Sequence, residues 1–417
     1  MSLLLYRLFI QLYSLSAYIF APVNLKARHW LQGRRNLLER MQQAIKPTDK
    51  IIWIHCASLG EFEQGQPVLK QLKQDYPSHK ILLTFFSPSG FEFQKDNPLA
   101  DYIFYLPIDT SSNAKAFYDI AKPKLVIFIK YEFWFNYLRE ANSRNIPLIL
   151  VSGIFRKEQP FFNWYGQLHR QMLSFFTLLL VQNENSVKLL QQLPLSLNVH
   201  LTGDTRFDRV LSIVDQFEPI HLIDIFCSTS KVVVAGSTWT DDDKELAHYA
   251  NTHPEVIFII APHNITPLRL TECSKYYKHS ILFSALKNAN IPAGINTLII
   301  DNVGMLSRLY KYATVCYVGG AFGADGVHNV LEAAVYAKPV VYGPEFEDYA
   351  EAVDLVKLGG GITVNTALEL EQVLDRLLEN TPAYNAACQA SYNYVQKMKG
   401  ATEATLRIIQ ENRLLTS

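Results

Sequence analysis

The chain has 417 residues, of which 49% are hydrophobic and 19% charged, and its 39 basic residues balance its 39 acidic residues. This length exceeds what a single hydrophobic core usually serves, so two domains of ordinary size are expected. The balanced charge gives no global field that would attract nucleic acid, so any anion must be bound by local groups.

The first 48 residues form an apolar and then basic segment. Residues 3–23 are strongly apolar, and Lys26, Arg28, Arg34 and Arg35 follow them. A cleavable signal peptide would place its positive charges before the apolar run. The observed order predicts a membrane-associated helix, held at the cytoplasmic face by the basic cluster, and a helix packed on the protein itself is the alternative.

Residues 49–215 alternate short apolar runs with longer amphipathic segments. The apolar runs are continuous rather than alternating, which predicts strands buried on both faces. These strands are expected at residues 50–58, 80–86, 125–131, 147–153, 178–183 and 199–204, with helices between them, for example at 65–77 and 133–145. This alternation is typical of βαβ units in a parallel sheet.

The pattern restarts after a polar connection near residues 212–226. A second strand series is expected at residues 231–238, 256–263, 297–301, 313–320, 338–344 and 361–365. The sequence therefore predicts an α/β protein with an N-terminal domain over 49–215 and a C-terminal domain over 216–417, whose last helix packs back on the first domain. The five cysteines are far apart, which favours a reducing compartment over disulfides or a zinc site.

Three turns in the second half are rich in small residues: "AGSTWTDDDKEL", "APHNITPLRL" and "GGAFGADGVHNVLEAA". In open α/β sheets the ligand lies beyond the carboxyl ends of the strands. Glycine lets the backbone approach a ligand there, and the following helix presents N–H groups to phosphate. One such turn is usually a tight connection, but three in one domain favour a nucleotide site.

The third of these turns carries His328, Asn329 and Glu332 at the expected start of a helix. The spacing would place His328 and Glu332 on one helical face. Glu332 would then accept hydrogen bonds from a ribose diol, with His328 and Asn329 nearer the phosphate. A surface Glu–His pair that only stabilises the helix explains the spacing equally well.

Six motifs, in order along the chain, resemble those of the bacterial 3-deoxy-D-manno-octulosonic acid (Kdo) transferases. They are "HCASLGE", "YLPID", "PKLVIFIKYEFWFN", "TGDTRFD", "VGML" and "HNVLEAA". The resemblance implies the GT-B fold, in which two Rossmann-like domains face a central cleft. It also implies inverting transfer of Kdo from CMP-Kdo to a lipid A precursor of the lipid IVA type, at the cytoplasmic side of the inner membrane, with no cofactor, metal or nucleic acid.

Catalytic roles follow from the same resemblance. An inverting transfer needs a base for the acceptor hydroxyl, and Glu61, which closes the S-x-G-E motif, corresponds to the family's proton acceptor. Glu63 has no counterpart and is expected to be exposed in the first helical turn. Arg206, Lys130 and Glu132 are the other expected catalytic residues. Arg206 replaces a family lysine and Lys130 a family acidic residue.

The donor site implied by the resemblance is larger. The residues expected to bind CMP-Kdo are Ser58, Gly60, Gly236, Ser237, Pro262, His263, Gly304, Met305, Leu306, Gly320, His328, Asn329, Val330, Leu331 and Glu332. The family's A-P-R-H motif has lost its arginine here, so the contacts to CMP at this position are expected either to be weaker or to be supplied by His263.

Two alternatives remain. Another GT-B nucleotide-sugar enzyme, such as an epimerase or a transferase for a different sugar, would share the turn over residues 319–334 but has no reason to keep "SLGE" together with "TGDTRFD". A non-catalytic membrane scaffold would be expected to lose Glu61 and Glu332. The aromatic stretch 155–176 is a further candidate for lipid contact, although most of its aromatic residues are expected in the core.

Overall fold

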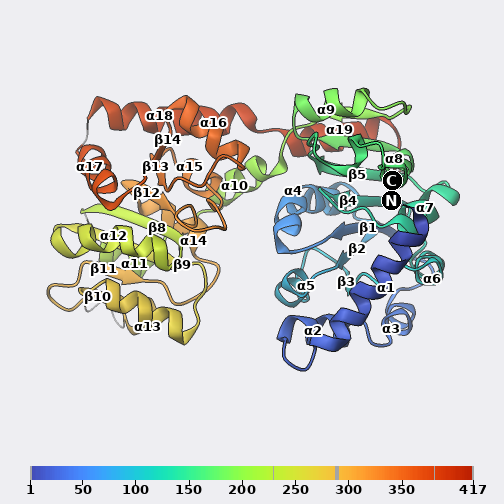
Figure 1. The fold of residues 1–417 in the computed structure, drawn as a ribbon, viewed down its shortest axis with the longest axis horizontal. Helices are drawn as coiled ribbons and strands as arrows, with labels where there is room; N and C mark the ends of the chain where they lie inside the picture. Colours follow the sequence, from blue (N-terminus) through green and yellow to red (C-terminus); the bar gives the residue numbers. More distant parts are fainter. Residues whose placement is uncertain (1, 229, 287–290, 380, 416–417) are drawn as a thin grey trace. The chain divides into compact units, whose positions relative to one another are not determined.

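The computed structural model describes residues 2–228, 230–286, 291–379 and 381–415 (Figure 1). It divides into two compact units. Unit 1 comprises Met1–Arg209 with Lys399–Ser417, and unit 2 comprises Val210–Met398. Each unit is built on one seven-stranded sheet in which all strand pairs are parallel.

The sheet of unit 1 has the strand order β3-β2-β1-β4-β5-β6-β7, which reverses direction between β1 and β4. Its strands are β1 (Lys50–Cys56), β2 (His79–Phe85), β3 (Tyr102–Tyr105), β4 (Leu125–Ile129), β5 (Leu148–Gly153), β6 (Leu178–Val181) and β7 (Val199–Leu201). The helices of the unit are α1 (Leu3–Phe20), α2 (Leu25–Gly33), α3 (Leu37–Ala44), α4 (Leu59–Asp75), α5 (Pro88–Gln94), α6 (Ser111–Ala121), α7 (Phe135–Ser143), α8 (Gln167–Ser174), α9 (Glu184–Gln191) and α19 (Ala401–Glu411).

The sheet of unit 2 has the order β10-β11-β9-β8-β12-β13-β14, which reverses between β8 and β12. Its strands are β8 (Lys231–Thr238), β9 (Val256–Pro262), β10 (Ser280–Leu282), β11 (Thr297–Ile299), β12 (Val315–Val318), β13 (Val340–Tyr342) and β14 (Gly361–Thr363). Its helices are α11 (His221–Cys227), α12 (Thr240–Thr252), α13 (Pro267–Tyr276), α14 (Leu306–Leu309), α15 (Leu331–Ala334), α16 (Ala350–Leu358), α17 (Ala367–Leu378) and α18 (Pro382–Met398).

Continuous apolar runs form these strands because both faces of each sheet are buried. In β1, Trp53 packs into the core on one face, whereas Ile52 and Ile54 pack into the core on the other. All twelve expected strands are present. The polar connection expected at 212–226 lies between the two strand series and is mostly helical, because α10 (Thr205–Asp215) and α11 cover most of it. The edge strand β10 is only half buried, so its sequence gives no strong apolar signal.

The end of the chain packs in unit 1. Leu406, Ile408 and Ile409 of α19 join the core on one face of its sheet. Asp208, the last residue of "TGDTRFD", accepts hydrogen bonds from the backbone N–H groups of Gly400 (2.7 Å) and Thr402 (2.6 Å). This carboxylate therefore holds the start of α19, where acidic groups are favourable.

The first helix is also part of unit 1. Tyr6 and Ile10 on its inner side are 5% exposed and belong to the core, and the Tyr6 hydroxyl donates to Asp109 at 2.5 Å. The outer side exposes large apolar side chains, among them Leu4, Leu5, Leu8, Phe9, Leu12, Leu15, Ile19 and Phe20. Among the described residues, α1 is the one helix long and apolar enough to cross a membrane.

The basic cluster after α1 is smaller than the sequence predicts. Arg34 points inward, where its guanidinium donates to the carbonyls of Leu106 (2.9 Å) and Phe86 (2.8 Å) and lies 4.0 Å from the Trp30 ring centroid. Arg34 is thus a structural cation rather than a headgroup ligand. Lys26 and Arg35 are exposed.

Candidate active site

Two candidate catalytic carboxylates of unit 1 lie at the point where its strand order reverses. Glu61 follows β1 and Glu132 follows β4, and these strands are neighbours. In open parallel sheets this switch point is where ligands bind, because loops from the two strands diverge and leave room.

Glu61 lies in the first turn of α4. The hydroxyl of Ser58, the residue that precedes the helix, donates to the Glu61 carboxylate. Gly60 is exposed, and a side chain there would meet nothing closer than the Ser58 hydroxyl at 3.9 Å. The backbone beside Glu61 is therefore exposed at Gly60, whereas Gly65, one turn after Glu61, packs closely on Ile129.

Glu132 is supported by a buried chain of hydrogen bonds. Its carboxylate accepts from the Trp134 indole and lies 3.2 Å from His55 Nε2. On the other side of the ring, His55 Nδ1 is 2.8 Å from the Thr84 hydroxyl, which also accepts from the Trp53 indole at 2.8 Å. In the neutral imidazole, Nε2 carries the proton toward Glu132 and Thr84 donates to Nδ1.

His55 was not among the residues expected at the site. It is fully buried and holds the position of Glu132. The only sequence signal for it is the first letter of the "HCASLGE" motif.

Lys130 directly follows β4 and has a strained backbone conformation. Its φ is +66°, in the left-handed region, and its N–H donates to the Val151 carbonyl at 2.9 Å. Its ammonium lies 5.0 Å from the ring centroid of Tyr131. A non-glycine residue in this region costs roughly 1–3 kcal/mol, and such strain clusters at functional sites.

Glu63 is partly exposed, with 37% of its side-chain surface accessible, and it also has a partner that the sequence does not indicate. Its carboxylate forms an ion pair of 3.1 Å with Arg209 of α10, and the Arg209 side chain is only 15% exposed. No local pattern in the sequence indicates this pair, because its members are distant in the chain. Glu63 thus differs from Glu61 in having a cationic partner that fixes α4 against α10.

Arg206 is oriented by its own loop. Its Nε and Nη2 atoms contact Asp204 Oδ2 at 2.8 and 2.7 Å. Asp204 is 5% exposed and accepts from the side chain of Gln64 in α4 at 2.9 Å. The "TGDTRFD" segment is therefore tied to the helix that carries Glu61.

The switch point of unit 2 is lined by backbone rather than by carboxylates. Gly236 in β8 has no room for a side chain, because a Cβ would lie 2.1 Å from the Tyr310 hydroxyl. Gly320, after β12, has φ +98°, and a Cβ would meet the Gly326 carbonyl at 2.3 Å. Ser237 adopts φ +55°. The close packing at Gly236 and the positive φ angles at Gly320 and Ser237 are enough to explain these residue types without a ligand.

Asp242 joins the two loops of this switch point. Its buried carboxylate accepts from the N–H groups of Trp239 (2.8 Å) and Gly320 (2.9 Å) and from the Tyr317 hydroxyl (2.7 Å). This role of Asp242 was not predicted from the sequence. One carboxylate thus fixes the β8–α12 turn to the loop after β12.

Three rings stack beside these loops. Trp239 and His263 have centroids 4.6 Å apart, and His263 and His328 have centroids 4.4 Å apart. The Trp239 indole donates to His328 Nε2 at 3.1 Å, so the proton of the neutral His328 ring lies on Nδ1. Burial, together with nearby His263, lowers the pKa of His328 to about 4.

The expected helix with His328 and Glu332 on one face is wrong. Helix α15 begins at Leu331, so His328 and Asn329 precede it and Glu332 is in its first turn. Asn329 instead links the segment: its Nδ2 donates to Glu332 at 3.2 Å and its Oδ1 accepts from the Leu331 N–H at 3.2 Å. The small side chains of the "GADGVHN" segment favour a loop over an earlier helix start.

The remaining expected donor residues fall into two groups. The side chains of Val330, Leu331 and Met305 are buried in the core of unit 2 and are positioned for packing. Gly304 has φ +88° with open space around it, in the turn before α14, and Pro262 ends β9 directly before His263.

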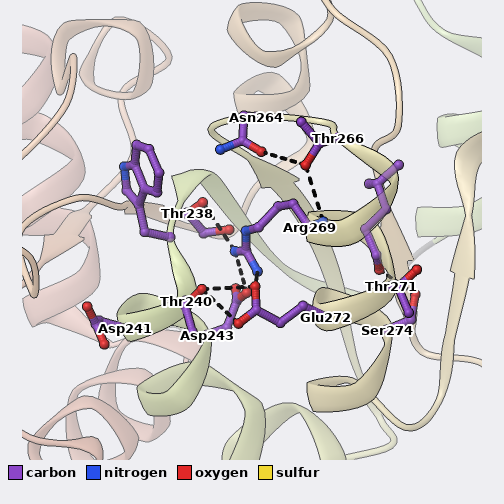
Figure 2. A network of polar contacts seen from close by, with 12 residues as sticks. Thr238, Thr240, Asp241, Asp243, Asn264, Thr266, Arg269, Thr271, Glu272 and Ser274 are labelled. Atoms are coloured by element: carbon purple, nitrogen blue, oxygen red, sulfur yellow. Dashed lines mark hydrogen bonds and ion pairs between the residues drawn. The ribbon is translucent and has the colours of Figure 1, made fainter. Parts of the chain in front are cut away.

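A second polar network supports the His263 loop (Figure 2). Arg269 of α13 forms a buried ion pair with Asp243 of α12, and its guanidinium also contacts the Thr238 carbonyl (3.3 Å) and Glu272 (3.4 Å). Glu272 accepts from the Thr240 hydroxyl at 3.0 Å. This network ties the starts of α12 and α13 together. Within the described residues, no group of acidic, histidine or cysteine side chains is arranged to hold a metal ion.

The two parallel-sheet units define the fold class as GT-B. Among solved structures, a UDP-N-acetylglucosamine 2-epimerase shares the fold with a TM-score of 0.61 and 17% identity, over 87% of this chain and 95% of that one. MurG from Acinetobacter baumannii matches with a TM-score of 0.53 and 15% identity, over 87% and 99% of the two chains. At these identities the likeness shows the fold alone.

Sequence comparison is more specific. The family described as 3-deoxy-D-manno-octulosonic-acid transferase (kdotransferase) matches residues 33–209. The 3-deoxy-D-manno-octulosonic acid transferase of Haemophilus influenzae is 28% identical over 90% of this chain and 91% of its own length. That of Aquifex aeolicus is 28% identical over 81% and 88%. These matches support a GT-B glycosyltransferase of the Kdo transferase type.

Proposed function

We propose that this enzyme transfers Kdo from CMP-Kdo to a lipid A precursor of the lipid IVA type, with inversion at the anomeric carbon. The observation that carries the proposal is the position of Glu61 in the first turn of α4, beside the β1/β4 switch point and next to Ser58. The same residue closes the "HCASLGE" motif that the chain shares with its family.

In the proposed mechanism Glu61 takes the proton of the acceptor hydroxyl as that oxygen attacks the anomeric carbon. The oxygen–carbon bond forms on one face of the sugar while the bond to the CMP phosphate breaks on the other. A base of this kind contributes about 10²–10⁴-fold in rate. Lys130 and Arg206 are the proposed cations for the developing negative charge, and Glu132 is the proposed partner that keeps the local charge balanced.

The CMP part of the donor is assigned to unit 2. Gly236, Ser237 and Gly320 offer backbone at the switch point, and Glu332 is the proposed acceptor for the ribose hydroxyls. His328 is neutral near pH 7, so it would act there as an Nδ1–H hydrogen-bond donor rather than as a cation.

The membrane assignment is to the cytoplasmic face of the inner membrane. The exposed apolar side of α1 supports it, together with the exposed Lys26 and Arg35. Deletion of residues 1–23 would also remove Tyr6 and Ile10 from the core of unit 1, so it is a poor test. Replacing Leu4, Leu8 and Leu15 by serine keeps the core, and we expect this variant to move from the membrane fraction to the soluble fraction.

The direct test of the reaction is to incubate the full chain with CMP-Kdo and a tetraacylated lipid A precursor and to weigh the lipid products by mass spectrometry. The proposal predicts lipid that carries one or more Kdo residues and stoichiometric release of CMP. An unmodified lipid, with CMP-Kdo intact or used for another acceptor, would reject it.

A further inference from the structure

A pocket of about 540 Å³ lies inside unit 1, apart from every residue assigned to the donor in unit 2. Its walls come from α1, from the segment after β4, from the loop before α8 and from α8 itself. Most of the lining is apolar or aromatic: Tyr6, Phe9, Phe133, Trp134, Phe161 and Met172. The volume and the lining are typical of a small-molecule site.

One part of the pocket wall reaches the switch point of unit 1. Glu132 lines the pocket, and its carboxylate is fixed by His55 and Trp134. A ligand in the pocket therefore touches the same segment that follows β4 and carries Lys130 and Glu132.

Another part of the wall belongs to the outer surface of α1. Phe9 lines the pocket and is 55% exposed, and the same helix exposes Leu8 (48%) and Leu12 (55%). The apolar lining is thus continuous with the one helical face in the described chain that suits a bilayer. Phe9 therefore belongs both to the pocket lining and to the exposed apolar side of α1.

The loop before α8 lines part of the pocket and also carries exposed aromatic residues of the kind found at membrane interfaces. Gln159, Pro160 and Phe161 line the pocket, and a few residues later Trp164 is 91% exposed and Tyr165 is 45% exposed. Exposed Trp and Tyr side chains favour the interface between membrane and water. Arg170 fixes this loop through the carbonyls of Phe161 (3.0 Å) and Asn163 (2.7 Å).

We propose that this pocket binds one acyl chain of the membrane lipid that accepts the sugar. The inference rests on the proposed function, since it concerns the lipid substrate of the same enzyme. An acyl chain needs no hydrogen bonds, which suits the aromatic walls, and it reaches the pocket along α1. Binding it there holds the sugar of the lipid at the β1/β4 switch point. Helix α1 is then both a membrane anchor and a wall of the acceptor site.

The first test does not depend on transfer. A tetraacylated lipid A precursor with a diazirine at the end of one acyl chain is placed in vesicles with the full-length protein and illuminated. The labelled residues are then found by mass spectrometry. The proposal predicts label on Phe161 and Met172 as well as on the outer leucines of α1. Label confined to outer residues such as Leu8 and Leu12 would overturn it.

The second test uses a matched pair of variants on α1. Phe9 and Leu12 are equally exposed, at 55%, but of these two residues only Phe9 lines the pocket. Both alanine variants are expected to bind vesicles equally. With acceptor dispersed in detergent, Phe9→Ala is expected to raise KM for the acylated lipid about tenfold, and Leu12→Ala to leave it unchanged. Equal KM values for the two variants would contradict the proposal.

The two tests separate this inference from the proposed function. Label inside the pocket without sugar transfer to any lipid would reject the proposed reaction and keep the pocket. Transfer to lipid with no label inside the pocket would reject the pocket and keep the reaction.

Discussion

The two units place very different chemistry at the same topological position. In unit 1 the switch point between β1 and β4 carries Glu61 and Glu132, and buried polar side chains such as His55 hold them. In unit 2 the switch point between β8 and β12 carries Gly236 and Gly320, and one buried carboxylate joins their loops.

This difference suits two different functions, proton transfer at the switch point of unit 1 and nucleotide binding at that of unit 2. Charged side chains that are held in place, but still reachable, suit proton transfer, because the reacting group must meet an atom with a defined protonation state. Glycine backbone and stacked neutral rings suit the recognition of a nucleotide, whose phosphate and base need N–H donors and flat surfaces. A substitution at the switch point of one unit should therefore change the function of that unit and leave the function of the other unchanged.

The largest effect is expected in unit 1. Glu61→Gln removes the base and keeps its shape, so turnover should fall by about 10²–10⁴-fold while CMP affinity is unchanged. Glu63→Gln is the matched control, because Glu63 lies on the same helix but pairs with Arg209. Initial rates at saturating donor measure the effect. Turnover of Glu61→Gln within twofold of wild type would remove Glu61 from the mechanism.

The next effect concerns the stability of unit 2. Asp242→Asn replaces one of the two acceptor oxygens by an NH₂ donor and removes the carboxylate that three donors share, so we expect a loss of about 1–3 kcal/mol in the free energy of unfolding. The control is Asp241→Asn, an exposed residue paired only with Lys244, which should change stability by less than about 0.5 kcal/mol. Calorimetry that finds the two variants equally stable would show that Asp242 does not hold the switch point together.

A smaller effect is expected for donor affinity. Glu332→Ala removes the proposed ribose acceptor and leaves Asn329 without a partner for its Nδ2 group, so CMP should bind up to about tenfold more weakly. Glu347→Ala, an exposed acidic residue of the same unit, is the control. Turnover at saturating donor should change less than affinity. Unchanged CMP affinity would rule out contact between Glu332 and the nucleotide.

The smallest effect is a shift in protonation. Trp239→Phe keeps a ring beside His263 but removes the indole N–H, which donates to Nε2 of the neutral His328 ring only. The pKa of His328 should therefore rise above about 4, while burial and His263 still hold it below 6.5. Histidine resonances followed by NMR against pH measure it, with Trp164→Phe as the control. A pKa of His328 that stays in place would show that the indole does not hold the ring neutral.

The lowered pKa of His328 also predicts how the free energy of unfolding changes with pH. A histidine whose pKa is lowered by folding binds fewer protons in the native state than in the unfolded chain. Its contribution to stability is therefore complete above about pH 6.5 and is lost as the pH falls toward 4. In Trp239→Phe this loss should be smaller.

The sequence predicts the fold well because both sheets are buried on both faces, so that runs such as residues 51–54 and 232–235 are continuously apolar. Motifs also lead to the segments of both switch points. The supporting residues are different: His55, Asp242 and Trp239 act through partners far away in the chain, and no local pattern marks them. The inward turn of Arg34 and the Glu63–Arg209 pair are missed for the same reason.

Titration of CMP into the full-length wild type, Glu61→Gln and Glu332→Ala proteins, followed by calorimetry, tests the division between the two units most directly. The wild type and Glu61→Gln should bind CMP with equal affinity, and Glu332→Ala should bind it more weakly. If Glu61→Gln lost CMP affinity as Glu332→Ala does, or if neither substitution changed it, nucleotide binding would not be confined to the switch point of unit 2.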